Sequence, residues 1–356
     1  MSRHHKRSRI AAIAAAVAVS ASLLTACGGP KDGATSCKDV NVEVGTVHSL
    51  SDALLYIAND KGYFAEQGLS VTFRSFKSAG EMIPYLAAGH LAVGAGAPSA
   101  GFYNGIARGI DIEIVADKGK LVTDYDYMPL LVSKKLYDSG QIRSVADLKG
   151  RSLAEPAPGT ATASTAQALL QSVGLDYSDV KHTFLGFPDH IAALQNGSVD
   201  AALTTEPAAS RALSTGAAVK LADSTTVYNG QQLAVLLYGG TFSKERSAAA
   251  QCFMNAYTHA AKDYAAAVRG GTWNGPGNQQ VVDIIARNID AKPEAVRATV
   301  PSYVDPDAML SVDSLQRDYE FFVKHRMYKG KKKIQFESLI NRNFLDTSAK
   351  LATEGK

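Results

Sequence analysis

The most constraining feature of the sequence is a unit that the chain uses twice, 108 residues apart. The stretches YLAAGHLAVGAGAPSAG (85–101) and ALQNGSVDAALTTEPAA (193–209) each combine an apolar helix end, a glycine, a short apolar run and a small-residue turn with a proline. The similarity continues, because GIDIEIVAD (109–117) matches GAAVKLAD (216–223). A repeat a domain's width apart predicts two similar units that each place the same helix, strand and turn beside a shared cleft.

Strand-like and helix-like patterns alternate around both copies of this unit. One alternating set runs from residue 40 to 117 and a second from 151 to 203. Such alternation predicts an α/β architecture with parallel-dominated sheets. We expect two lobes, each a sheet flanked by helices, and two hinge crossings at 128–134 and 231–240. The C-terminal part of the chain is expected to be helical.

The N-terminal segment has the pattern of a signal peptide. Four basic residues precede an apolar run at 10–24, which is shorter than the roughly 20 residues of a membrane span. The run ends in Leu24-Thr25-Ala26-Cys27, which resembles a bacterial lipobox, whose cysteine becomes the lipidated first residue. A plain cleavage site beside a chance cysteine is the alternative. We expect an exported protein, anchored to the outer face of the cell membrane by lipid on Cys27.

Export also affects how the remaining two cysteines and the net charge are interpreted. An oxidising compartment favours a disulfide between Cys37 and Cys252, although two unrelated buried thiols would also fit the sequence. The formal net charge of +3 comes from the basic residues that precede the apolar run, so the remainder of the chain is close to neutral. It lacks the basic face that nucleic-acid binding requires.

Several further stretches resemble the solute-binding proteins of ABC importers. These are GYFAEQGLSVTF, LAAGHLAVG, VADLKGRSLA, LQNGSVDAALTTEP and DPDAMLSVDSLQRDYEFFVKHRM, in an order and spacing that is similar to the nitrate, sulfonate, taurine and thiamine-pyrimidine-precursor branch (NMT1-like). The resemblance covers nearly all of residues 40–350. It implies the type II periplasmic-binding-protein fold and a monomeric receptor that delivers a small solute to an ABC permease, without a cofactor. The implied order is a lipoprotein signal peptide (1–26), a lipidated tether (27–39), the first part of lobe 1 (40–130), lobe 2 (131–235) and a return to lobe 1 (236–356).

Four loops are expected to line the solute site. Ligands of open α/β sheets bind at the carboxyl ends of strands, where helix N-termini offer free N–H groups. The loops 46–50, 78–80, 96–99 and 158–162 have this position and are rich in small or hydroxyl side chains, which ordinary helix capping would also select. Glu206 follows the strand of the second copy of the repeat and is expected either to contact the solute or to pair locally. The expected ligand-binding residues are His48, Ser49, Ser78, Gly80, Gly96, Ala97, Pro98, Ser99, Gly159, Thr160, Ala161, Thr162 and Glu206.

The charge pattern leaves the sign of the solute open. The helix that follows the fourth loop carries no acid through Ala168, which suits an anion, and Arg74 and Lys118 could supply a positive charge. Glu206 would instead favour an amine-bearing heterocycle. The leading expectation is an anion similar to a sulfonate, nitrate or taurine, and the alternative is a pyrimidine or another aromatic heterocycle.

Enzyme and metal motifs are weak in this sequence. GAGAPSAG departs from the dinucleotide fingerprint, and GxSxG, HExxH and CxxC do not occur. His182 and His190 lack a spacing typical of metal ligands, so no metal is expected. We expect a receptor rather than an enzyme, and an exported enzyme on the same scaffold is the weaker alternative. The basic cluster at 329–333 is interpreted as a solvated surface.

Overall fold

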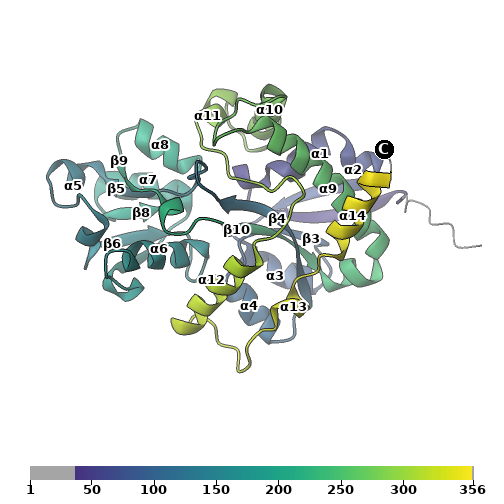
Figure 1. Ribbon diagram of the computed structural model, residues 1–356, viewed down its shortest axis with the longest axis horizontal. Coiled ribbons are helices and arrows are strands. Elements are labelled where there is room, and N and C mark those ends of the chain that lie inside the picture. Colours follow the sequence, from purple (N-terminus) through teal and green to yellow (C-terminus); the bar gives the residue numbers. More distant parts are fainter. Residues whose placement is uncertain (1–36, 355–356) are drawn as a thin grey trace, which may run out of the picture. The chain divides into compact units, whose positions relative to one another are not determined.

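Two five-stranded sheets organise the chain in the computed structural model, which describes residues 37–354 (Figure 1). The first sheet has the order β2-β1-β3-β10-β4. β1 pairs in parallel with β2 and β3, whereas β10 runs antiparallel between β3 and β4. All nine residues of β10 are buried, which explains its continuous apolar run. The strands are β1 (Val40–Thr46), β2 (Leu69–Ser75), β3 (Val93–Gly96), β4 (Ile112–Leu121) and β10 (Gln231–Gly239).

The second sheet repeats this arrangement, with the order β7-β6-β8-β5-β9. β6 pairs in parallel with β7 and β8, and β5 is the antiparallel strand between β8 and β9. The repeated sequence unit places β3 and β8 at equivalent positions, which confirms two parallel-dominated sheets of one design. The strands are β5 (Leu130–Ser133), β6 (Ser152–Glu155), β7 (Lys181–Phe184), β8 (Ala201–Leu203) and β9 (Ala218–Ala222).

Helices cover both sheets, and we call each sheet with its helices a lobe. In lobe 1, α9 packs against α1, α2, α10 and α14, and α12 packs against β10 and α4. In lobe 2, α7 packs against α8, β5, β8 and β9. The helices of lobe 2 are α5 (Lys134–Asp138), α6 (Ala161–Gln171), α7 (Phe187–Asn196) and α8 (Ala208–Ser214). Those of lobe 1 are α1 (Ala53–Asp60), α2 (Tyr63–Glu66), α3 (Ala79–Ala87), α4 (Ala100–Ala107), α9 (Ser247–Ala267), α10 (Asn278–Asn288), α11 (Pro293–Arg297), α12 (Val312–Lys324), α13 (Phe336–Leu339) and α14 (Asn343–Glu354).

The chain passes between the sheets at two segments that lie side by side. The first runs from β4 to β5 (122–129) and the second from β9 to β10 (223–230). Ser224 joins them, since its N–H donates to Asp126 Oδ1 (3.1 Å) and its hydroxyl donates to Met128 O (2.5 Å). Their adjacency would let both segments bend about one axis.

These positions correct the expected crossings at 128–134 and 231–240. The apolar runs assigned to the crossings are the central antiparallel strands β5 and β10, which are buried along their whole length. Residues 231–235, expected in lobe 2, therefore lie in the sheet of lobe 1. With these bounds, we propose that lobe 2 comprises residues 130–222, and that residues 40–121 and 231–350 form lobe 1.

The described residues belong to one compact unit, whose N-terminal end is covalently fixed. Cys37 and Cys252 are joined in a disulfide with a Cα–Cα distance of 6.5 Å. The bond attaches the residues before β1 to α9. The expected signal peptide (1–26) and Cys27 lie outside the described residues.

Within the described part of the chain, no helix has both the length and the apolar character needed to cross a membrane.

Candidate functional site

The loops at the carboxyl ends of the two sheets meet directly. Ala100, which begins α4 after β3, donates its N–H to the carbonyl oxygen of Gly159 in the loop after β6 (2.7 Å). Gly159 has a φ of +63°, and a Cβ atom added to it would lie 2.6 Å from Ala100 Cβ. Glycine is therefore required both by the backbone conformation and by the close approach of the lobes. The third and fourth expected loops are brought together at this contact.

The first expected loop is held by a helix start and by a distant acid. Ser49 precedes a short helical turn and donates its N–H to Asp52 Oδ2 (2.9 Å), while its Oγ lies 2.9 Å from Ser51 Oγ. His48 is exposed, and its Nε2 lies 3.6 Å from Asp290 Oδ2. This part of the chain therefore presents the hydroxyls of Ser49 and Ser51, whereas the imidazole of His48 lies beside Asp290, just after α10.

A buried ion pair lies directly behind this loop. Lys118, on β4, places Nζ 2.9 Å from Asp52 Oδ1 and donates to Ser51 Oγ (2.6 Å). The side chains of Lys118 and Asp52 are 1% and 0% exposed. Sequence reasoning named Lys118 only by its position and did not find this pairing. The positive charge that an anionic solute would use is thus already matched by a carboxylate.

The second and third loops act as helix starts. Ser78 is the N-cap residue of α3, and Ser99 Oγ accepts a hydrogen bond from Phe102 N (3.2 Å) at the start of α4. Gly96 lies tightly against this region, since an added Cβ would be 2.7 Å from Ala79 Cβ. Gly80, by contrast, faces open space apart from the hydroxyl of Ser78, which would lie 3.6 Å from an added Cβ. Helix capping is sufficient to explain why a serine stands at position 99. Ala97 is half-buried and Pro98 buried between Gly96 and this cap.

The fourth loop begins α6, whose first turn is fixed to lobe 1. Thr160 is the N-cap residue, with Oγ1 2.6 Å from Thr162 Oγ1, and Ala161 O accepts a hydrogen bond from Gln231 Nε2 (3.0 Å). Gln231 is the first residue of β10. No acid occurs in this first turn, which leaves its N–H groups suited to a negative charge.

A buried aspartate on α12 completes the contact between α6 and lobe 1. Asp318 accepts hydrogen bonds from Ser164 Oγ (2.6 Å), Tyr228 OH (2.6 Å) and Gln231 Nε2 (3.2 Å). Burial raises the pKa of Asp318 to about 6. Sequence reasoning missed this network. The available signal was the position of an aspartate between apolar residues spaced three and four apart on an amphipathic helix.

Glu206 pairs locally, which is the second of the two outcomes left open by the sequence. Its carboxylate accepts hydrogen bonds from Ser210 N (3.0 Å), Ser210 Oγ (2.8 Å) and Val300 N (3.3 Å), and the residue is 3% exposed. Burial raises the pKa of Glu206 despite these bonds. Both oxygens are therefore engaged in joining the start of α8 to the segment after α11.

Lobe 2 carries a second buried acid at the carboxyl end of β6, also missed by sequence reasoning. Glu155 Oε1 accepts from Tyr177 OH (2.9 Å) and lies 2.6 Å from His182 Nδ1, while His182 Nε2 lies 2.7 Å from Tyr177 O. Because both ring nitrogens face oxygen acceptors, the ring is arranged to carry both protons. Burial alone would lower the pKa of His182, but the hydrogen bond and charge of Glu155 outweigh it and raise the pKa.

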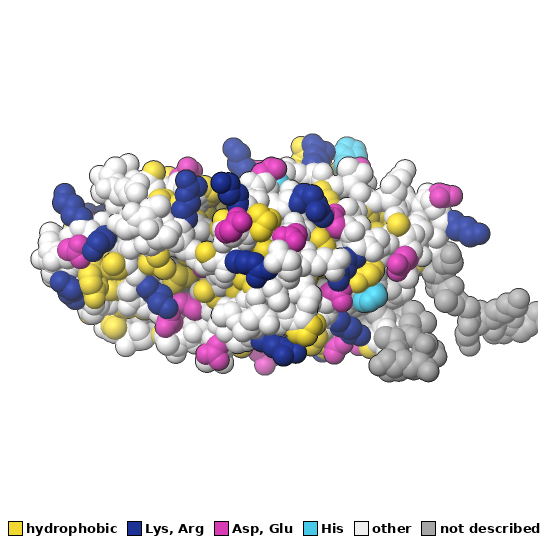
Figure 2. Space-filling view, turned by 90° about the horizontal axis from the view of Figure 1, so that it is seen from above, with side chains coloured by type: hydrophobic (Ala, Val, Ile, Leu, Met, Phe, Trp, Pro, Cys, Tyr) yellow, Lys and Arg dark blue, Asp and Glu magenta, His cyan; other side chains and the backbone are white. Residues whose placement is uncertain are grey.

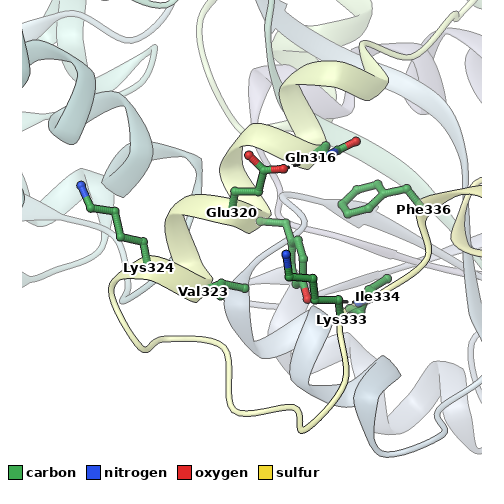
Figure 3. A pocket seen from close by; sticks show the side chains of 8 residues that line it. Gln316, Glu320, Val323, Lys324, Lys333, Ile334 and Phe336 are labelled. Atoms are coloured by element: carbon green, nitrogen blue, oxygen red, sulfur yellow. Dashed lines mark hydrogen bonds between the residues drawn. The ribbon is translucent and has the colours of Figure 1, made fainter.

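Two cavities lie beside α12 rather than at the expected loops. One, of about 400 Å³, lies between α6 and α12, and the other, of about 320 Å³, lies between α12 and the segment before α13 (Figure 3). Neither is lined by the expected ligand-binding residues. Among the residues that the structure describes, no group of three or more His, Cys, Asp or Glu side chains is placed to hold a metal.

Comparisons with solved structures agree with this architecture. The alkanesulfonate-binding protein SsuA from Xanthomonas axonopodis pv. citri has a TM-score of 0.65 and 19% identity, over 86% of this chain and 99% of its own. The periplasmic nitrate-binding protein NrtA from Synechocystis PCC 6803 has a TM-score of 0.69 and 13% identity, over 90% and 91%. The desulfurization enzyme DSZB has a TM-score of 0.59 and 16% identity, over 88% and 99%. These similarities confirm the periplasmic-binding-protein fold.

Sequence comparison supplies the family. No curated protein matches the sequence. The model of the NMT1-like family matches residues 36–268, which is more than half of the chain. The chain therefore belongs to the NMT1-like family.

Proposed function

We propose that the protein is an extracytoplasmic receptor of an ABC import system, which binds a small solute between its lobes and delivers it to a membrane permease. The observation that carries this proposal is the contact between Ala100 and Gly159, which joins the carboxyl-end loops of two sheets with the same strand order. Family membership and the fold shared with SsuA and NrtA support it. We also propose lipid attachment at Cys27, which would hold such a receptor beside its permease.

The proposed solute contacts are the four expected loops. Backbone N–H groups at the starts of α3, α4 and α6 can donate to an acceptor, and the hydroxyls of Ser49, Ser78, Thr160 and Thr162 can donate or accept. Rotation about the crossing segments would separate the loops, and a solute that touches both lobes would stabilise the closed arrangement. Glu206 is not included, because its oxygens already have partners.

A small anion such as a sulfonate is the leading solute. The first turn of α6 has no acid, so its N–H groups are uncompensated. A second candidate is a zwitterion or an amine-bearing heterocycle, because Asp52 already balances the charge of Lys118. An exported enzyme is less well supported, since the rings of His182 and His190 bond to Glu155 and to backbone carbonyls rather than to a hydroxyl or thiol.

A thermal-shift screen tests the receptor role directly. Residues 35–356 would be mixed with nitrate, taurine, alkylsulfonates, aromatic carboxylates and aminopyrimidines. A solute at about 100 times its Kd should stabilise the fold by about 2.7 kcal/mol, which raises Tm by a few degrees. A panel without any shift contradicts the proposal, and chemical conversion of a bound solute, detected by mass spectrometry, favours the enzyme.

A matched pair of glycine variants tests the site between the lobes. Gly159→Ala introduces strain and a clash with Ala100, whereas Gly174→Ala has a similar φ (+78°) with nothing within 4 Å of the added Cβ. We expect Gly159→Ala to weaken binding of the best solute at least about tenfold, because each 1.4 kcal/mol lost from the closed form costs that factor. Gly174→Ala should lower Tm without changing affinity. Equal affinities in both variants would rule out the proposed contact of the fourth loop.

A further inference from the structure

The segment between α12 and α13 concentrates positive charge. Residues 326–333, which we call the basic loop, contain five cations and no acid. All five side chains belong to exposed residues, and none forms an ion pair with the part of the chain that the structure describes. On the face drawn in Figure 2, by contrast, basic and acidic side chains are interspersed. The five cations are Arg326, Lys329, Lys331, Lys332 and Lys333.

The backbone of the basic loop is fixed by hydrogen bonds. Asn104 of α4 donates through Nδ2 to Met327 O (3.1 Å) and accepts from Lys329 N at Oδ1 (2.6 Å). Tyr328 OH donates to Lys332 O (2.6 Å), and its ring packs 5.0 Å from that of Tyr319. The loop extends beyond α4, α12 and α13 in Figure 1. Its cations are therefore displayed from a structured projection.

The cavity beside this loop does not account for the charge. Lys333 lies at its edge together with Glu320, whose Oε1 accepts from Gln316 Nε2 (3.0 Å) (Figure 3). Lys324 points away from Lys333 in this view. A cavity lining of mixed charge is a poor site for a small anion. The exposed cations of the basic loop are therefore better suited to a binding partner with an extended negative surface.

We propose that the basic loop docks the receptor onto an anionic lipid bilayer. Four of its five cations are lysines, which act as point charges without the fixed fork of arginine. Protein interfaces are enriched in arginine and depleted in lysine, so a lysine-rich loop suits the diffuse charge of a membrane better than a folded protein partner. This inference rests on the proposed function, which places the protein beside a membrane. The loop would then orient the receptor on the surface to which its lipid is attached.

Vesicle binding tests this proposal with residues 35–356, which carry no lipid. Vesicles with about 30 mol % phosphatidylglycerol and vesicles of phosphatidylcholine alone would be compared at about 50 mM salt, where screening is weak. We expect partitioning to the anionic vesicles only. The variant with Lys329, Lys331, Lys332 and Lys333 changed to Gln should partition to the anionic vesicles at least about a hundredfold more weakly. Each lysine near such a surface strengthens binding roughly fivefold.

A control variant with the same loss of charge makes the test specific to the loop. Changing Lys77, Lys135, Lys149 and Lys181 to Gln, all at exposed positions elsewhere, should reduce partitioning by less than about threefold. Equal losses in the two variants, or no wild-type binding to anionic vesicles, would overturn the proposal. Binding to polyglutamate without binding to vesicles would also overturn it and indicate an acidic protein partner. The solute screen on the same variants keeps the two proposals separate, because the loop contributes no solute contact.

Discussion

The two lobes share a strand order but differ in what surrounds their sheets. Lobe 1 is covered by the C-terminal helices and closed by the disulfide, and its core contains large side chains such as Tyr103, Phe253 and Phe322. On one face of lobe 2 the core cluster is mostly alanine around Leu131, Leu194 and Val199. Less apolar area is buried per side chain there, so we expect lobe 2 to open locally before lobe 1. A repeated topology therefore does not bring equal stability.

The carboxyl ends of the two sheets also differ, in the ionisable groups that lie there. Lobe 1 places the ion pair of Lys118 and Asp52 there, and both side chains are buried. Lobe 2 places Glu155 beside His182, and against the effect of burial the hydrogen bond and charge of Glu155 raise the pKa of this imidazole. We therefore expect acidity to act on lobe 2 through His182, and on the junction of α6 and α12 through Asp318.

The largest expected effect comes from breaking the buried ion pair of lobe 1. Lys118→Met leaves the Asp52 carboxylate buried without its partner, which should lower the free energy of unfolding by about 3–5 kcal/mol in urea titrations. Lys134→Met is the matched control, because the 2.8 Å pair of Lys134 and Asp138 is about half exposed and should contribute less than about 1 kcal/mol. Equal decreases in the free energy of unfolding of the two variants would show that Lys118 is accessible to water.

Removing the disulfide should have the next largest effect. Cys37 and Cys252 are 215 residues apart, and loss of such a bond typically lowers stability by about 2–5 kcal/mol, because the unfolded chain gains freedom. Dithiothreitol should lower Tm of the wild-type protein. In Cys37→Ala, whose bond is already absent, the reductant should change nothing. Two free thiols before reduction, measured with Ellman's reagent, would contradict the bond.

Local patterns were sufficient to predict the fold and the position of the loops. The alternating elements and the repeated unit indicated two similar sheets, and turn residues such as Ser49, Ser99 and Thr160 stand at helix starts as expected. The crossing positions were wrong because β5 and β10 are central strands of the sheets, so the chain crosses in the segments that precede them.

The long-range pairs could not be predicted in the same way. Lys118 and Ser51 are separated by 67 residues, and Ser164 and Asp318 by 154. No local pattern links such positions, because the pairing depends on how the sheets and α12 are placed in space. A polar residue on an apolar stripe can indicate that a buried partner exists, but it does not identify that partner.

The smallest expected effect concerns the pH dependence of the junction between α6 and α12. Burial raises the pKa of Asp318 to about 6, so the folded protein binds this proton more tightly than the unfolded chain, whose aspartates titrate near 4. The contribution of Asp318 to stability therefore falls as pH rises from about 4 to 6, by at most about 3 kcal/mol, and is constant above that range. Asp318→Asn removes this dependence, whereas Asp313→Asn, at an exposed position of the same helix, should retain it. Urea titrations of both variants between pH 4 and 7 measure the difference. If the free energy of unfolding changes equally with pH in the two variants, the carboxyl group of Asp318 is not the one that titrates.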